Sequence, residues 1–213
     1  MKRYSIGFIS HDEEVFNHYL GPSIKGLEGE FEIGYTSDEC HPAHNYNAMI
    51  KDCTTEYLIL THQDVTFTKD LLERIDMTIA VVGEDFGALG MVGVTQPGEK
   101  KLYHWANVDT AIPVDTLDSC FIVVQVKNGP LFDEETFDDF HLYVEDYCAT
   151  ISHEPHNKGV YTILTEGGSI WRPQETMYLA HHSATINKVG NAWGLYDKYW
   201  GRFGRKWPGV RTT

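Results

Sequence analysis

The sequence predicts a single α/β domain with a mostly parallel central sheet flanked by helices and a helical extension at the C-terminal end. Apolar strand-like runs alternate with segments of helical spacing over residues 1–94, in the order β-α-β-α-β-α-β of a doubly wound sheet. The run at 57–60, YLIL, has no polar interruption, which is typical of a central strand covered on both faces. A length of 213 residues suits one substantial domain, and no internal repeat or linker divides it.

The first three elements follow from simple periodicity. Residues 4–10 alternate as a strand does. Apolar side chains then recur at a spacing close to 3.6 over residues 15–27, which predicts an amphipathic helix. Gly21 and Pro22 should kink or break that helix. Residues 31–35 predict a short second strand, which ends in a polar turn.

The middle of the chain continues the alternation. Pro42 suits the first turn of a helix, and that helix leads into the central strand at 57–60. Apolar residues over 71–79 have helical spacing, and the apolar run at 86–94 predicts the next strand. Residues 95–113 contain a Pro-Gly turn and no clean period, so we expect an excursion or a hairpin over the sheet edge.

The last part of the chain is more polar. Residues 114–126 return to strand character, although two aspartates interrupt them. Residues 144–151 have helical spacing, and residues 160–164 predict a final strand. Aromatic residues over 193–207 have the spacing of a helix that packs back on the domain.

The formal net charge of −14 disfavours attraction to the phosphates of DNA or RNA, so we expect no nucleic-acid partner. An acidic protein that handles a diphosphate needs a divalent cation or a local basic patch. Residues 186–213 offer such a patch, and a solvated basic tail is the alternative reading. Its basic residues are Lys188, Lys198, Arg202, Arg205, Lys206 and Arg211.

The cysteines indicate a reducing environment. Cys40, Cys53, Cys120 and Cys148 form no CxxC pair, so the sequence predicts neither a zinc knuckle nor a disulfide framework, and a cytoplasmic location fits best. No window approaches the 18 apolar residues of a membrane span. Residues 1–10 enter the first strand without a cleavage site, so we expect no signal peptide and no transmembrane segment.

The central strand ends abruptly in His62, Gln63 and Asp64. Ligands of open α/β sheets bind at the carboxyl ends of such strands, so a carboxylate there is a candidate for a metal or phosphate site. An acidic turn is the alternative. Glu145 and Asp146 stand at the start of a predicted helix, where the helix dipole alone favours acidic residues.

Four motifs follow one another along the chain: NAMIKDCTTEYLILTHQDV, VDTLDSCFIVV, FDEETFDDFHLYVEDYC, and HHS with a downstream KW. In order and spacing they resemble family 2 glycosyltransferases of the GT-A fold. The resemblance is closest to a bacterial branch like the streptomycin-biosynthesis type, in which HQD replaces the usual DxD. It covers the chain from Tyr4 to about Trp207.

The resemblance implies a metal site. Asp64 matches the last DxD position, which binds the divalent metal that bridges the nucleotide diphosphate, and His62 matches the first. His182 matches a histidine that completes the site, with His181 as the equivalent by a one-residue slip. The implied ion is Mn²⁺ or Mg²⁺, because Mg²⁺ needs only one or two carboxylates and imidazole suits Mn²⁺.

The resemblance also implies catalytic and substrate-binding residues. Asp146 matches the catalytic base of inverting enzymes, and Glu145 is the reserve candidate. The residues implied to contact the nucleotide or to line the sugar or acceptor pocket are Asn47, Asp38, Ser10 and Asp118.

The chain is thus expected to be a glycosyltransferase that moves a sugar from a nucleotide-sugar donor to a hydroxyl of a small-molecule, glycan or lipid-linked acceptor. Residues 1–94 would form the nucleotide-binding half, 95–185 the acceptor half and 186–213 a basic aromatic extension. A nucleotidyltransferase of similar fold would need a Gly-rich phosphate loop where this chain has SHDEE. A binding protein of the same fold without turnover is favoured by the missing first carboxylate of DxD.

Overall fold

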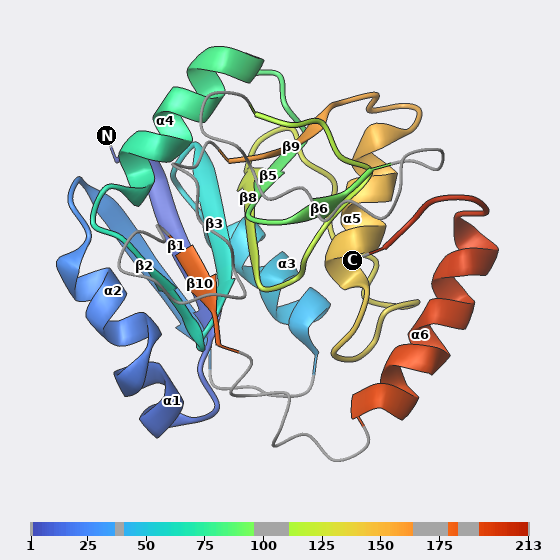
Figure 1. Cartoon of the computed structure of the whole chain (residues 1–213), viewed down its shortest axis with the longest axis horizontal. Helices are drawn as coiled ribbons and strands as arrows, with labels where there is room; N and C mark the ends of the chain where they lie inside the picture. Colours follow the sequence, from blue (N-terminus) through green and yellow to red (C-terminus); the bar gives the residue numbers. More distant parts are fainter. Residues whose placement is uncertain (1, 37–40, 96–110, 164–178, 183–191, 213) are drawn as a thin grey trace.

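The computed structural model describes residues 2–36, 41–95, 111–163, 179–182 and 192–212. These residues form three layers, a six-stranded sheet with helices on both faces (Figure 1). Helices α2 (Leu20–Gly26) and α4 (Leu71–Val82) pack on one face. Helices α3 (Pro42–Asp52), α5 (Tyr143–Ser152) and α6 (Ala192–Lys206) contribute to the core on the other.

The strands confirm the predicted alternation in the first half of the chain. The elements up to β5 are β1 (Tyr4–Ile9), α1 (Glu13–His18), α2, β2 (Phe31–Thr36), α3, β3 (Tyr57–His62), β4 (Val65–Phe67), α4 and β5 (Ala88–Gly90). The described elements that follow are β6 (Gly93–Val94), β7 (Thr116–Leu117), β8 (Phe121–Gln125), α5, β9 (Val160–Thr162), β10 (Leu179–His181) and α6.

The sheet has the order β2-β1-β3-β8-β5-β9, and only β8 runs antiparallel to its neighbours. The backbone N–H of Asp118 bonds to the carbonyl of Val92, so the chain is still at the carboxyl end of β5 just before β8 begins. Without a crossover to the other edge, the next strand must run back in the opposite direction. The fold class predicted from the sequence, a mostly parallel sheet between helices, is confirmed.

Several details differ from the sequence prediction. The strand predicted at 114–126 is divided into β7, in a two-stranded sheet, and β8, in the main sheet. The first helix breaks at Tyr19, between α1 and α2, and not at Gly21 and Pro22. Pro22 lies in the first turn of α2, where a missing N–H costs no intrahelical bond. The predicted strand at 86–94 is two strands in different sheets, because β6 leaves the main sheet to pair with β7. Most of the predicted excursion at 95–113 lies outside the described residues.

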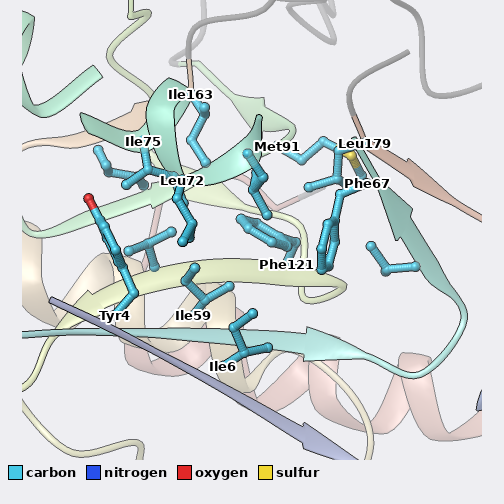
Figure 2. Close-up of a cluster of buried hydrophobic side chains, with 14 of the residues drawn as sticks. Tyr4, Ile6, Ile59, Phe67, Leu72, Ile75, Met91, Phe121, Ile163 and Leu179 are labelled. Carbon is cyan, nitrogen blue, oxygen red and sulfur yellow. The ribbon is translucent and has the colours of Figure 1, made fainter. Parts of the chain in front are cut away.

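The core on the α4 side also holds the small sheet of β4 and β10 in place. Figure 2 shows Phe67 and Leu179 beside Phe121 and Met91 at one end of this cluster. Leu179 is buried there, which anchors β10 against β4 and the main sheet. In the part of the chain that the structure describes, no helix is long and apolar enough to cross a membrane.

Candidate metal and sugar-nucleotide site

The end of β3 places two polar side chains at the carboxyl edge of the sheet. Side chains of a strand alternate between its faces, and Leu58 and Leu60 point into the core that contains α3 and α5. His62 follows in the same register, and its Nε2 lies 3.0 Å from the hydroxyl of Tyr143, the first residue of α5. Asp64 lies in the turn between β3 and β4 and is fully buried.

Gln63, the middle residue of HQD, ties two loops together. Its Oε1 accepts hydrogen bonds from the backbone N–H groups of His11 and Asp12, at 3.2 and 3.1 Å. Its Nε2 lies 3.0 Å from Nε2 of His11. Because His11 and Asp12 follow β1, this side chain fixes the loop after β1 against the end of β3.

The adjacent histidines of the HHS motif point to different places. Leu179 and His181 share one face of β10, and the burial of Leu179 in the core turns His181 toward the end of β3. The Nε2 atom of His181 lies 3.4 Å from Oδ1 of Asp64. His182 faces the other way, with its Nε2 2.8 Å from the hydroxyl of Thr66 and its ring stacked on Tyr19 at 4.3 Å.

His62, Asp64 and His181 therefore meet at one place. Each offers one ligand atom, and these atoms lie within 4.8 Å of one another. One carboxylate oxygen and two imidazole nitrogens are a suitable donor set for Mn²⁺, whereas Mg²⁺ prefers oxygen ligands and would take the rest from phosphates and water. The residues present thus fit a divalent cation. His181, and not His182, completes the group.

A second possible set of ligands adjoins the first. Asp118, Cys120 and His181 also offer ligand atoms within 4.8 Å of one another. Asp118 is half-buried just before β8, and its Oδ1 accepts a hydrogen bond from the backbone N–H of Cys120 at 2.9 Å. Sequence reasoning missed Cys120, because no sequence spacing links it to His181, 61 positions later.

The pKa values of His62 and His181 shift in opposite directions. Burial, assisted by the neighbouring His181, lowers the pKa of His62 to about 4, so its ring is neutral near pH 7 and retains a lone pair for a cation. Burial alone would lower the pKa of His181 as well. Its hydrogen bond with Asp64 and the charge of Asp118 outweigh that effect and raise the pKa.

Asp146 lies in the first turn of α5, as predicted, and its side chain contacts the last residue of α6 and the residue just beyond it. Its Oδ1 accepts a hydrogen bond from the indole Nε1 of Trp207 at 2.7 Å, and Lys206 Nζ lies 2.9 and 3.0 Å from its two oxygens. Burial raises the pKa of Asp146, and Lys206 and Trp207 oppose that rise. Glu145 is also buried in this turn.

The remaining predicted site residues are dispersed. Ser10 is half-buried after β1, and its N–H bonds to the carbonyl of Thr36 at the end of β2. Asp38 lies outside the described residues. Asn47 is buried in α3, where its Nδ2 donates to the carbonyl of Phe132 at 2.9 Å and its Oδ1 accepts from the N–H of Phe132 at 2.8 Å. The side chain of Asn47 therefore joins α3 to the segment before α5.

We expect Asn47→Ala to lower the free energy of unfolding by about 3 kcal/mol, because it leaves the buried N–H and C=O of Phe132 without their partner. Urea denaturation would measure the loss, with exposed Asn128→Ala as the control. An unchanged stability together with weaker nucleotide binding would instead give Asn47 the nucleotide contact implied by the sequence resemblance.

No protein-family model and no curated protein matches this chain. Solved structures do resemble it. The crystal structure of residues 1–349 of TarS from S. aureus has a TM-score of 0.54 at 11% identity, covering 96% of this chain and 72% of that one. The UDP complex of the same TarS fragment has a TM-score of 0.52 at 13% identity, covering 76% of this chain and 58% of that one.

GalNAc-T7, whose structure contains UDP, GalNAc and Mn²⁺, has a TM-score of 0.55 at 5% identity. The match covers 76% of this chain but only 42% of GalNAc-T7. At these identities, the likeness shows that the fold is that of the GT-A glycosyltransferases.

Proposed function

We propose that this protein is a metal-assisted glycosyltransferase that moves a sugar from a nucleotide-sugar donor to an acceptor hydroxyl with inversion at the anomeric carbon. The observation that carries the proposal is the meeting of His62, Asp64 and His181 at the carboxyl edge of β3. Ligand sites of open α/β sheets lie at this edge. The GT-A fold, together with UDP in TarS and UDP with Mn²⁺ in GalNAc-T7, supports the same reading.

Asp64, His62 and His181 would hold Mn²⁺ or Mg²⁺. When bound, the cation supplies positive charge that stabilises the diphosphate as it leaves. Asp64 contributes the negative charge that the cation needs, and Tyr143 holds the ring of His62 through its hydroxyl. Gln63 keeps the loop after β1, which includes Ser10, close to the same edge.

Asp146 is our candidate for the base, with Glu145 in reserve. An acceptor hydroxyl attacks the anomeric carbon on the face opposite the diphosphate. The new carbon–oxygen bond forms as the bond to the phosphate oxygen breaks, and that electron pair departs with the nucleoside diphosphate. The carboxylate of Asp146 takes the hydroxyl proton. Asp146 lies in the first turn of the helix whose first residue, Tyr143, contacts His62.

Three further residues would bind the substrates. Ser10 and Asp38 would border the nucleoside, and Asp118, beside His181, would line the sugar or acceptor pocket. The acceptor is a small molecule, a glycan or a lipid-linked molecule. The division into a nucleotide-binding half, an acceptor half and a C-terminal extension stays a prediction, as do the bacterial branch of the family and the cytoplasmic location.

A second candidate is a nucleotide-sugar-binding protein of the same fold without turnover. One observation favours it: the side chain of Asp146 is only 1% exposed, and both of its oxygens are in contact with Lys206. A base must come within hydrogen-bonding distance of the acceptor hydroxyl. The two candidates differ in whether a bound donor is converted.

A panel of nucleotide sugars, each with Mn²⁺, Mg²⁺ or a chelator, would test the proposal. Thermal stability reports binding, and nucleoside diphosphate release reports turnover. We expect metal-dependent stabilisation by one class of donor and release of its nucleotide. Stabilisation without release, with a range of acceptors present, would favour the binding protein. Neither effect with any donor would contradict both candidates.

The neighbouring histidines provide a matched pair of variants. His181→Ala should weaken Mn²⁺-dependent donor binding by at least about 10-fold, because it removes a ligand of the cation. His182→Ala should leave that affinity nearly unchanged, because His182 contacts Thr66 and Tyr19. Isothermal titration calorimetry of the donor would measure both affinities, and the reverse ranking would return the ligand role to His182.

A further inference from the structure

The C-terminal end of α6 covers the carboxylate of Asp146. Trp207 Nε1 donates to Oδ1 at 2.7 Å, while Lys206 Nζ lies 2.9 Å from Oδ1 and 3.0 Å from Oδ2. These contacts join residues about sixty positions apart, from the start of one helix to the end of another. Together they contact both oxygens of the Asp146 carboxylate.

Helix α6 is firmly anchored where it makes these contacts. Tyr199 and Phe203 are buried in the core that contains α3 and α5. The hydroxyl of Tyr199 donates to Oδ1 of Asp138 at 2.7 Å, and Arg202 Nη1 lies 2.7 Å from the same oxygen. The position of Trp207 relative to α5 is therefore set by packing as well as by its own hydrogen bond.

The two residues that cover Asp146 differ in mobility. Trp207 presents a rigid ring from an anchored helix end. Lys206 has a flexible stem, its side chain is 32% exposed, and its Nζ also lies 2.7 Å from Oδ2 of Asp133. Lys206 thus has a second carboxylate to hold when it leaves Asp146. An acceptor hydroxyl that takes the place of the ammonium on Oδ2 would leave the indole contact on Oδ1 intact.

We propose that Lys206 and Trp207 are positioning residues for Asp146: Trp207 orients the carboxylate, and Lys206 pairs with its negative charge and yields Oδ2 to the acceptor hydroxyl. This inference rests on the proposed function, since it concerns the proposed base. It assigns a specific task to the basic, aromatic end of the chain. It also relates the burial of the carboxylate to proton transfer, because Lys206 can leave Oδ2 for Asp133 while Trp207 stays on Oδ1.

The charges around Asp146 predict the direction in which its pKa changes when Lys206 is replaced. Burial raises the pKa of Asp146, Lys206 and Trp207 lower it, and the nearby charge of Asp133 raises it. Removing the ammonium should therefore raise that pKa further. Because the base works only when deprotonated, kcat/KM rises with pH through this pKa, and a higher pKa moves the acid limb of the profile to higher pH.

Lys206→Met should move the acid limb up by about one pH unit, the smallest effect expected for losing an opposite charge in direct contact. Lys206→Arg should restore a profile close to that of the wild type. Trp207→Phe, which keeps an aromatic ring but loses the N–H, should lower kcat/KM by about 10-fold. Donor affinity, measured by calorimetry, should stay unchanged in all three variants.

Lys198→Met is the matched control, because Lys198 is also a lysine of α6 but lies beside Asp138 and Tyr199. Its profile should match that of the wild type. An active wild type whose acid limb moves no further in Lys206→Met than in Lys198→Met would overturn the positioning role and leave the proposed function standing. A wild type that binds donor but releases no nucleotide would instead overturn the proposed function. NMR titration of the labelled Asp146 carboxyl carbon would then still decide whether Lys206 lowers its pKa.

Discussion

Replacing Asp64 with asparagine should abolish metal-dependent binding of the nucleotide-sugar donor. The amide keeps the shape of the buried side chain but removes the one carboxylate among His62, Asp64 and His181. Neither histidine can supply the negative charge that a divalent cation requires, since an imidazole that binds a cation does so in its neutral form. We expect donor affinity in Mn²⁺ to fall by more than about 100-fold, as measured by calorimetry.

Glu28→Gln is the control for this change. Glu28 is an exposed carboxylate that pairs with Lys69 on the surface, so its loss changes the net charge equally without touching the site. Thermal unfolding in the presence of a chelator should show that Asp64→Asn remains folded. Donor affinity of the folded variant equal to that of the wild type in Mn²⁺ would refute the metal site at the end of β3.

The parts of the fold and the site that depend on local pattern could be predicted from the sequence. An uninterrupted apolar run identified β3 as a buried strand, and the abrupt change to HQD marked its carboxyl end. The spacing of apolar residues placed Asp146 in the first turn of α5. In each case the pattern and the residue of interest lie within one element, so periodicity alone relates them.

The parts that depend on distant contacts could not be predicted. The choice between His181 and His182 follows from Leu179, whose burial sets which face of β10 points at Asp64. The burial of Leu179 depends on tertiary packing. A shift of one residue in the register of β10 would exchange the side chains on its two faces. Cys120 joins the site for a similar reason, because β8 runs antiparallel and so starts at the edge where its parallel neighbours end.

Asp146→Asn should spare donor binding and lower the rate of sugar transfer by between about 100-fold and 10,000-fold. The amide can still accept the hydrogen bond from Trp207, so the packing of α6 against α5 is largely kept. It cannot take a proton from the acceptor hydroxyl at neutral pH, and general-base catalysis of this kind contributes a factor in that range. Donor calorimetry and a steady-state transfer assay, run on the same preparation, would separate binding from turnover.

Asp133→Asn is the appropriate comparison, because it removes the other carboxylate that Lys206 contacts, at 2.7 Å, and leaves Asp146 in place. If disturbing the ion pairs of Lys206 were enough to stop transfer, the two variants would lose activity together. If Asp146 is the base, Asp146→Asn loses far more activity than Asp133→Asn, which removes only the carboxylate that holds Lys206 when it leaves Asp146. Equal transfer rates in Asp146→Asn and the wild type would remove Asp146 from the mechanism and make Glu145, in the same buried turn, the next residue to replace.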